Sequence, residues 1–148
     1  RKTTPGMRIF EKYAVKCGGG YNHRFDLSKG VLIKDNHIQA AGSITKALKK
    51  IDKNYWIELE VDTIEQIFEG LENNVNGFLL DNMKPKKIKE SVKIIRSYQS
   101  GGDEIFIEAS GGINLKNIQP YLDTGVNGIS IGALTHQINS SDIKLEFR

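Results

Sequence analysis

The chain has 148 residues, 39% hydrophobic and 26% charged, which is typical of one globular domain and leaves little room for a second. No apolar run exceeds three residues, whereas a membrane-spanning helix needs roughly 20, so we expect no membrane insertion. The net charge of +3 is too small and too evenly spread to require a nucleic-acid partner, and it suits small anionic ligands equally well.

The cysteine content and the N-terminal residues indicate the compartment. Cys17 is the only cysteine, which excludes an intrachain disulfide and a multi-cysteine zinc site. The first residues lack the apolar core of a signal peptide. We therefore expect a reducing, cytoplasmic environment.

Short apolar runs alternate with amphipathic helical windows along the chain. Thr4-Pro5-Gly6 opens a predicted helix with Met7, Phe10, Ala14 and Cys17 on one side, which places Cys17 in the interior as a structural residue. Residues 1–3 then form the end of a strand, so we expect further residues before Arg1.

Four strand–helix units follow this first helix, and a fifth strand closes the series. The predicted strands are 31–35, 57–61, 77–81, 104–109 and 128–132, and the predicted helices cover 44–51, 64–71, 85–95, 114–122 and, briefly, 134–138. Thr63 and Gln66 form a predicted capping box at the start of one helix, and Pro85 lies in the first turn of the next.

This alternation predicts an α/β fold of parallel strands joined by crossover helices. Either a barrel or an open doubly wound sheet satisfies the pattern. A complete eight-unit barrel typically needs about 200 residues or more. Residues 1–148 therefore fit the later part of an incomplete, TIM-like parallel α/β barrel that is truncated at its N-terminal side.

Polar side chains mark the predicted strand ends, where parallel α/β folds gather their reactive groups. These residues are Arg1, Lys2, Lys34, Asp35, Asn36, Glu58, Glu60, Asp62, Asp81, Asn82, Glu108, Ser110, Gly132 and, just beyond, His136. Glu58, Glu60 and Asp62 alternate with apolar residues and so share one strand face. In a barrel this face points inward, where charge needs a cation or a ligand. The alternative is a half-exposed antiparallel edge strand with a solvated face.

Glycine-rich loops indicate further candidate sites. Ser110-Gly111-Gly112 follows one strand and Gly132 closes another, and such loops let a phosphate approach backbone N–H groups. Two ordinary glycine turns explain the pattern equally well. The stretch Cys17-Gly18-Gly19-Gly20-Tyr21-Asn22-His23-Arg24 fits either a binding segment or a flexible helix terminus. His37 and His136 lack ligand spacing to a second His or Cys, so no zinc site is expected.

Together these motifs closely resemble the quinolinate phosphoribosyltransferase family, over essentially the whole chain. The strings that carry the resemblance are RKTTPG (1–6), EKYAV (11–15), CGGG (17–20), NHR (22–24), LIKDNH (32–37), ELEVD (58–62), LDNM (80–83), EASGGI (108–113) and GALTH (132–136). The resemblance implies an additional N-terminal domain before the barrel and assembly as a homodimer or a larger homo-oligomer.

The resemblance also implies an activity: phosphoribosyl transfer from phosphoribosyl pyrophosphate to quinolinate with decarboxylation, in NAD biosynthesis and with Mg²⁺. By resemblance, Arg1, His23 and Arg24 bind the two quinolinate carboxylates, and Lys2 and Lys34 lie between quinolinate and the pyrophosphate. Glu60 and Asp81 hold the ribose hydroxyls and, directly or through water, Mg²⁺. Ser110, Gly111, Gly132 and His136 receive the 5′-phosphate. The implied catalytic set is Lys2, Lys34, Glu60 and Asp81, and the division of roles between Glu58 and Glu60 stays open.

Three other interpretations fit the same residues. A related barrel could act on another aromatic acid, although His23 and Arg24 favour quinolinate. Lys34 at a strand end also suits a Schiff-base lyase. The third is a binding module without catalysis.

Overall fold

A single parallel sheet organises the chain. The computed structural model describes residues 2–98, 104–137 and 139–147. The strands are β1 (Val31–Ile33), β2 (Ile57–Val61), β3 (Gly77–Asp81), β4 (Phe106–Ser110) and β5 (Gly128–Ile129). They pair side by side in chain order, all in parallel. All five predicted strands are confirmed, although β1 and β5 end earlier than expected.

The helices follow the predicted alternation with two differences. They are α1 (Arg8–Cys17), α2 (Asp35–Ala41), α3 (Ile44–Leu48), α4 (Ile64–Glu72), α5 (Pro85–Tyr98), α6 (Gln119–Leu122) and α7 (Ala133–His136). The capping box of Thr63 and Gln66 is present at the start of α4. Helix α2 was not predicted. The helix expected from Asn114 begins only at Gln119, because the Asn114 and Asn117 side chains accept backbone N–H groups and form a turn instead.

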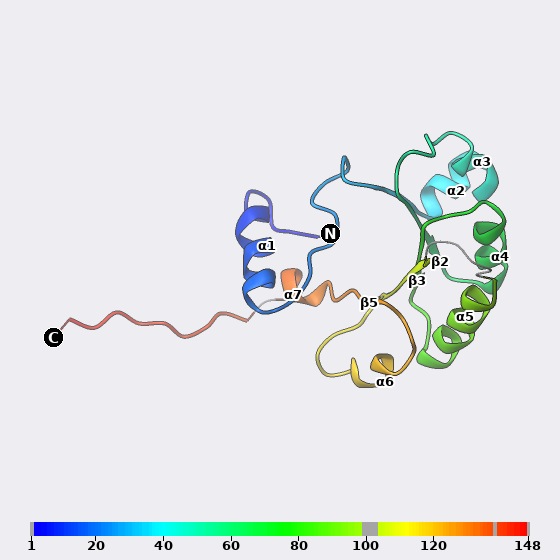
Figure 1. Cartoon of the computed structure of the whole chain (residues 1–148). Coiled ribbons are helices and arrows are strands. Elements are labelled where there is room, and N and C mark those ends of the chain that lie inside the picture. The colour runs from blue at the N-terminus through cyan, green and yellow to red at the C-terminus, as the bar shows by residue number, and fades with distance from the viewer. Residues whose placement is uncertain (1, 99–103, 138, 148) are drawn as a thin grey trace.

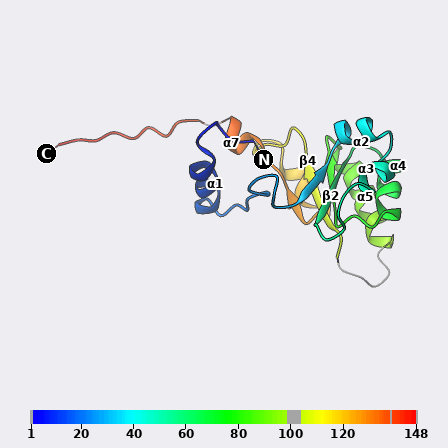
Figure 2. The same ribbon diagram turned by 90° about the horizontal axis from the view of Figure 1, so that it is seen from above.

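All of the larger crossover helices lie on one side of the sheet. Helices α2 to α5 form a layer there, whereas α1 and α7 lie on the opposite side in both views (Figures 1 and 2). A doubly wound sheet would carry crossover helices on both faces and reverse its strand order. Sequential order with helices on one face is instead the arrangement of a barrel wall. The prediction of an incomplete barrel is therefore confirmed, and the sheet is open.

The hydrophobic core lies between the sheet and this helical layer. Alternate strand residues enter it, and they pack against the apolar stripes of α3, α4 and α5. These strand residues are Leu59, Val61, Phe78, Leu80, Ile107 and Ala109. The side chains between them in sequence therefore face the open side of the sheet. Because β2 pairs in parallel with both β1 and β3, the antiparallel edge-strand interpretation is wrong.

Helix α1 differs from the prediction. Cys17 is exposed and not buried, and Phe10 is 65% exposed. Within the described residues, no member of α1 belongs to the hydrophobic core, because α1 lies across the sheet from it. The one buried residue of the helix is Lys12. Lys2 and Thr3 lie outside any strand, so the strand end expected at 1–3 is not formed in the described part of that range.

None of the helices in the described ranges combines the length and the apolar character that crossing a bilayer requires.

Packing of α4 on the sheet yields a stability prediction. A Cβ at Gly70 would lie 2.6 Å from the Phe78 ring and 2.7 Å from Leu59. Alanine normally stabilises a helix by about 1 kcal/mol relative to glycine, but overpacking costs about 1–3 kcal/mol. We expect Gly70→Ala to lower the free energy of unfolding by about 1–2 kcal/mol in urea denaturation. Glu72→Ala, at an exposed position of the same helix, is the control. A more stable Gly70→Ala protein would contradict this packing.

Candidate active site

Acidic side chains lie at the centre of the open sheet face. The strand register pairs Glu60 with Leu79 and Leu79 with Glu108, so these three form one row across β2, β3 and β4. Glu58 precedes this row on the same face. Glu58 and Glu108 are only 2% and 7% exposed. The predicted inward orientation therefore holds for Glu58 and Glu60, whereas Asp62, past the strand end, is exposed.

Lys34 brings a positive charge to the carboxyl end of this face. It directly follows β1, and its Nζ lies 3.5 Å from Oε2 of Glu60. The Lys34 backbone N–H donates to Nδ1 of His37 at 3.0 Å, so the first turn of α2 fixes the residue that carries the ammonium group. His37 thus has a local structural role that its sequence spacing did not reveal.

The ends of β3 and β4 meet beside this pair. Asp81 is the register partner of Ser110. Asn82 has φ +52°, its side chain donates to Oδ2 of Asp81 at 2.5 Å, and its backbone N–H donates to the Ser110 carbonyl. Gly111 has φ +96°, and a Cβ there would lie 2.3 Å from Oδ1 of Asn82. Only glycine fits at this position, so Gly111 allows the ends of β3 and β4 to approach each other closely.

His23 lies over the buried acids. Its Nε2 is 3.4 Å from Oε2 of Glu58 and 3.7 Å from Oε2 of Glu108. Its Nδ1 accepts the Arg24 backbone N–H at 2.8 Å, which assigns the proton of a neutral imidazole to Nε2. The ring N–H therefore faces the two carboxylates, across β3.

Among the described residues, His23, Glu58 and Glu108 form the one group of three or more histidine, cysteine or acidic residues whose ligand atoms, within 4.8 Å of one another, could hold a metal ion. A metal on Nε2 would need that atom deprotonated and the proton on Nδ1. A proton on Nδ1 would point at the Arg24 backbone N–H, which donates a hydrogen bond to that same atom in this structure. The arrangement therefore favours a histidine–carboxylate cluster over a metal centre.

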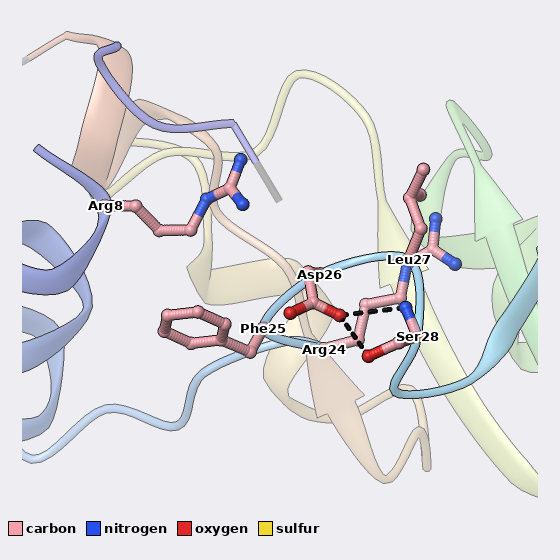
Figure 3. Close-up of a pocket in the computed structure, with 6 residues that line it drawn as sticks. All are labelled: Arg8, Arg24, Phe25, Asp26, Leu27 and Ser28. Atoms are coloured by element: carbon pink, nitrogen blue, oxygen red, sulfur yellow. Dashed lines mark hydrogen bonds between the residues drawn. The ribbon is translucent and has the colours of Figure 1, made fainter. Parts of the chain in front are cut away.

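Arg24 points away from His23. Its Nη1 donates to the Gly30 carbonyl at 2.7 Å. Its side chain lines an open pocket of about 500 Å³ together with Arg8, Phe25, Asp26, Leu27 and Ser28 (Figure 3). Hydrogen bonds from the hydroxyl and the backbone N–H of Ser28 hold the pKa of Asp26 below its usual value. The side chains of His23 and Arg24 therefore do not point to one ligand position in this structure, although the sequence prediction assigns both to the quinolinate carboxylates. Arg1, the third predicted quinolinate ligand, lies outside the described residues.

Lys2 and His136 meet at a second, smaller pocket of about 280 Å³. The Thr135 hydroxyl donates to the Lys2 carbonyl at 2.6 Å, which ties the N-terminal segment to α7. A Cβ at Gly132 would lie 2.8 Å from Nε2 of His136, so these two predicted phosphate ligands are also adjacent. The structure thus groups Lys2 with His136, whereas Lys34 pairs with Glu60.

Comparison with known proteins identifies the family. Residues 1–146 match the family model described as "Quinolinate phosphoribosyl transferase, C-terminal domain". The chain belongs to this family.

Relatives of the quinolinate phosphoribosyltransferase domain come from several kingdoms. A probable carboxylating nicotinate-nucleotide pyrophosphorylase of Bacillus subtilis is 45% identical over 99% of this chain and 50% of its own length. A decarboxylating, mitochondrial quinolinate phosphoribosyltransferase of Nicotiana glauca is 39% identical over 99% of this chain and 46% of its own. The chain thus spans about half the length of the curated relatives it matches.

Solved structures agree with the fold. The crystal structure of nicotinate-nucleotide pyrophosphorylase from Ehrlichia chaffeensis is 46% identical and superposes with a TM-score of 0.85, covering 96% of this chain and 51% of that one. Thiamine phosphate pyrophosphorylase from Pyrococcus furiosus is 19% identical with a TM-score of 0.50, covering 88% and 68%, and shows a similar fold alone.

In this quinolinate phosphoribosyltransferase domain, the predicted residues fall into three groups. The first lies at the carboxyl edge of the sheet and comprises Lys34, Glu60, Asp81, Ser110 and Gly111. The second comprises Lys2, Gly132 and His136 at α7, and the third comprises His23 and Arg24 on the segment after α1. The sequence pattern did not indicate that Lys12 is buried or that Arg8 lines a pocket, because both are charged residues on a helix whose buried side was assigned to apolar residues.

The turn after β4 yields a matched pair of variants. Gly111→Ala combines left-handed strain of about 1–2 kcal/mol with a clash against Asn82, so we expect a loss of about 2–5 kcal/mol in unfolding free energy. Gly112→Ala has φ +61° but open space around the Cβ, so strain of about 1–2 kcal/mol alone should apply. Denaturant unfolding of both variants measures the difference. Equal losses would show that the contact with Asn82 does not constrain the turn.

Proposed function

We propose that this domain transfers the phosphoribosyl group of phosphoribosyl pyrophosphate to quinolinate, with release of pyrophosphate and CO₂ and formation of nicotinate mononucleotide for NAD biosynthesis. The observation that carries the proposal is the Lys34–Glu60 pair at the carboxyl edge of the sheet, beside Asp81 and the tight glycine turn. The chain's membership of the family supports the choice of substrates.

Quinolinate recognition requires positive groups, because the substrate carries two carboxylates. In the proposal, Arg1 and Arg24 offer guanidinium forks, which match carboxylate geometry. Lys2 and Lys34 provide additional ammonium charge on the pyrophosphate side. His23, which lies over the buried acids, is assigned to the same side of the site. Arg24 reaches quinolinate by leaving the Gly30 carbonyl that it contacts in this structure.

The carboxylates of Glu60 and Asp81 suit Mg²⁺, which prefers oxygen ligands and substrate phosphates. Both lie on the open sheet face at neighbouring strands, so we assign them to the ribose hydroxyls and the ion. The bound ion would neutralise charge on the departing pyrophosphate. Ser110 and Gly111 with Gly132 and His136 would receive the 5′-phosphate.

The proposed reaction proceeds in two stages. The quinolinate nitrogen forms a bond to the anomeric carbon as the bond from that carbon to the pyrophosphate oxygen breaks. Positive charge develops on the sugar, and the carboxylate of Glu60 stabilises it electrostatically. The ring is then a pyridinium, so the carboxylate beside the nitrogen leaves as CO₂ and a proton replaces it on the ring carbon. Side chains of the domain supply positioning and charge, with no covalent intermediate.

A homodimer or a larger homo-oligomer is part of the proposal. The N-cap residue Met7 and the α1 residues Ile9, Phe10 and Tyr13 are each at least 45% exposed. Adjacent exposed apolar side chains on one helix favour association. We also place the domain in the cytoplasm, although its Nicotiana glauca relative is named as mitochondrial.

The first experiment measures CO₂ release and nicotinate mononucleotide formation from quinolinate and phosphoribosyl pyrophosphate. It uses the chain alone and the chain fused behind the N-terminal half of the Bacillus subtilis relative. We expect product with Mg²⁺, and at least a hundredfold less with excess chelator. No product from either folded form would reject the proposed function, and undiminished product under chelation would reject the metal assignment.

Substitution of the Lys34–Glu60 pair tests the assigned roles. We expect Lys34→Ala and Glu60→Ala each to lower kcat/KM by about 10²–10³-fold, because each removes charge directed at the reacting groups. Lys53→Ala, at an exposed lysine far along the chain, is the matched control. Circular dichroism checks that the fold is retained. Near-normal activity in either variant would remove that residue from the catalytic set.

A further inference from the structure

Helix α1 buries a lysine and leaves its apolar residues exposed. Lys12 is 8% exposed, whereas Ile9, Phe10 and Tyr13 on the same helix are 65–70% exposed. Burial of an ammonium group is costly unless hydrogen bonds compensate it. Burial, with a smaller contribution from the charge of Arg8, lowers the pKa of Lys12. Packing of apolar residues therefore does not explain why Lys12 is the buried residue of α1.

The Lys12 side chain makes its hydrogen bonds with one short segment. Its Nζ donates to the backbone carbonyls of His23 at 3.0 Å and Arg24 at 3.3 Å. It also lies 5.7 Å from the centre of the Phe25 ring, within reach of a cation–π contact. In return, the Asn22 side chain donates to the Lys12 carbonyl at 2.9 Å. One residue of α1 therefore contacts four consecutive residues, 22–25.

This segment has little else to hold its backbone. Residues 20–30 form neither helix nor strand, and backbone-to-backbone hydrogen bonds are absent from residues 21–25 in the described part of the chain, before a turn at 27–28. A glycine with positive φ lies on each side, at Gly19 and Gly30, which permits alternative backbone paths. Side-chain hydrogen bonds therefore determine where His23 and Arg24 lie.

We propose that Lys12 is a positioning residue, whose two carbonyl hydrogen bonds fix the His23–Arg24 backbone so that His23 lies over Glu58 and Glu108 and the Arg24 side chain starts from a fixed point when it leaves the Gly30 carbonyl to bind quinolinate. The proposal rests on the proposed function for the identity of the ligand. Because Lys12 acts on the backbone, it affects the quinolinate side of the site and leaves the phosphate loops at Gly111 and Gly132 unchanged.

Lys12→Met tests this role, because methionine has similar length and no donor. We expect the KM for quinolinate to rise at least tenfold, while the KM for phosphoribosyl pyrophosphate stays within twofold. Lys12→Arg keeps charge and donors, so its KM for quinolinate should lie closer to that of the unaltered protein. Lys16→Met, at an exposed lysine of the same helix, is the control. Equal changes in both KM values, or none, would overturn the proposal.

A second readout does not depend on activity. Trypsin cleaves after Arg24, and mass spectrometry can compare that cleavage with cleavage after the exposed Lys53 in the same sample. We expect Lys12→Met to raise the relative rate at Arg24 at least fivefold, and Asn22→Ala, which removes only the return hydrogen bond, to raise it less. If Lys12→Met does not fold, Lys12→Gln, whose shorter side chain cannot span both carbonyls, serves for both readouts.

The two readouts separate the possible failures. An unaltered protein that forms no product rejects the proposed function, yet the cleavage ratio still tests the contact between Lys12 and the segment. An unchanged ratio in the folded variants overturns the positioning role, and so does faster cleavage without a change in the KM for quinolinate.

Discussion

The two buried carboxylates on the open sheet face constrain much of the surrounding structure. Glu58 and Glu108 are only 2% and 7% exposed, so both carboxylates lose most of their contact with water in the folded domain. Burying carboxylates without partners costs several kcal/mol each. His23 lies over both carboxylates from the irregular segment between α1 and β1, and hydrogen bonds from Lys12 of α1 hold that segment. The acidic face therefore determines which groups must lie above it.

Local features were predictable from the sequence, and contacts between distant segments were not. The Thr63–Gln66 capping box spans four residues, and its chemistry is complete within them. The apolar stripe containing Cys17 was equally clear, but a stripe does not reveal which surface a helix meets. Lys12 gave no signal, because its partners are backbone carbonyls, which every residue type possesses.

In the candidate site, too, some features could be predicted from the sequence and others could not. Strand-end residues such as Lys34 and Glu60 were predicted to gather at one edge of the sheet, because parallel strands bring their carboxyl ends together there, and the two side chains do meet. The opposed directions of His23 and Arg24 could not be predicted, since adjacent residues in an irregular segment have no fixed relation. The closeness of Gly111 to Asn82 required the register of β3 and β4, which the sequence pattern leaves undetermined.

The order of strands in the sheet has a consequence for biosynthesis. Each strand pairs only with the strands next to it in the chain, so every pairing becomes available as the following unit leaves the ribosome. The pair of β1 and β2 needs nothing beyond residue 61, and the hydrogen bonds between Lys12 and the segment at 22–25 need still less. The pairing of β1 with β2 and the contacts of Lys12 with the segment at 22–25 can thus form cotranslationally, before β3, β4 and β5 have been synthesised.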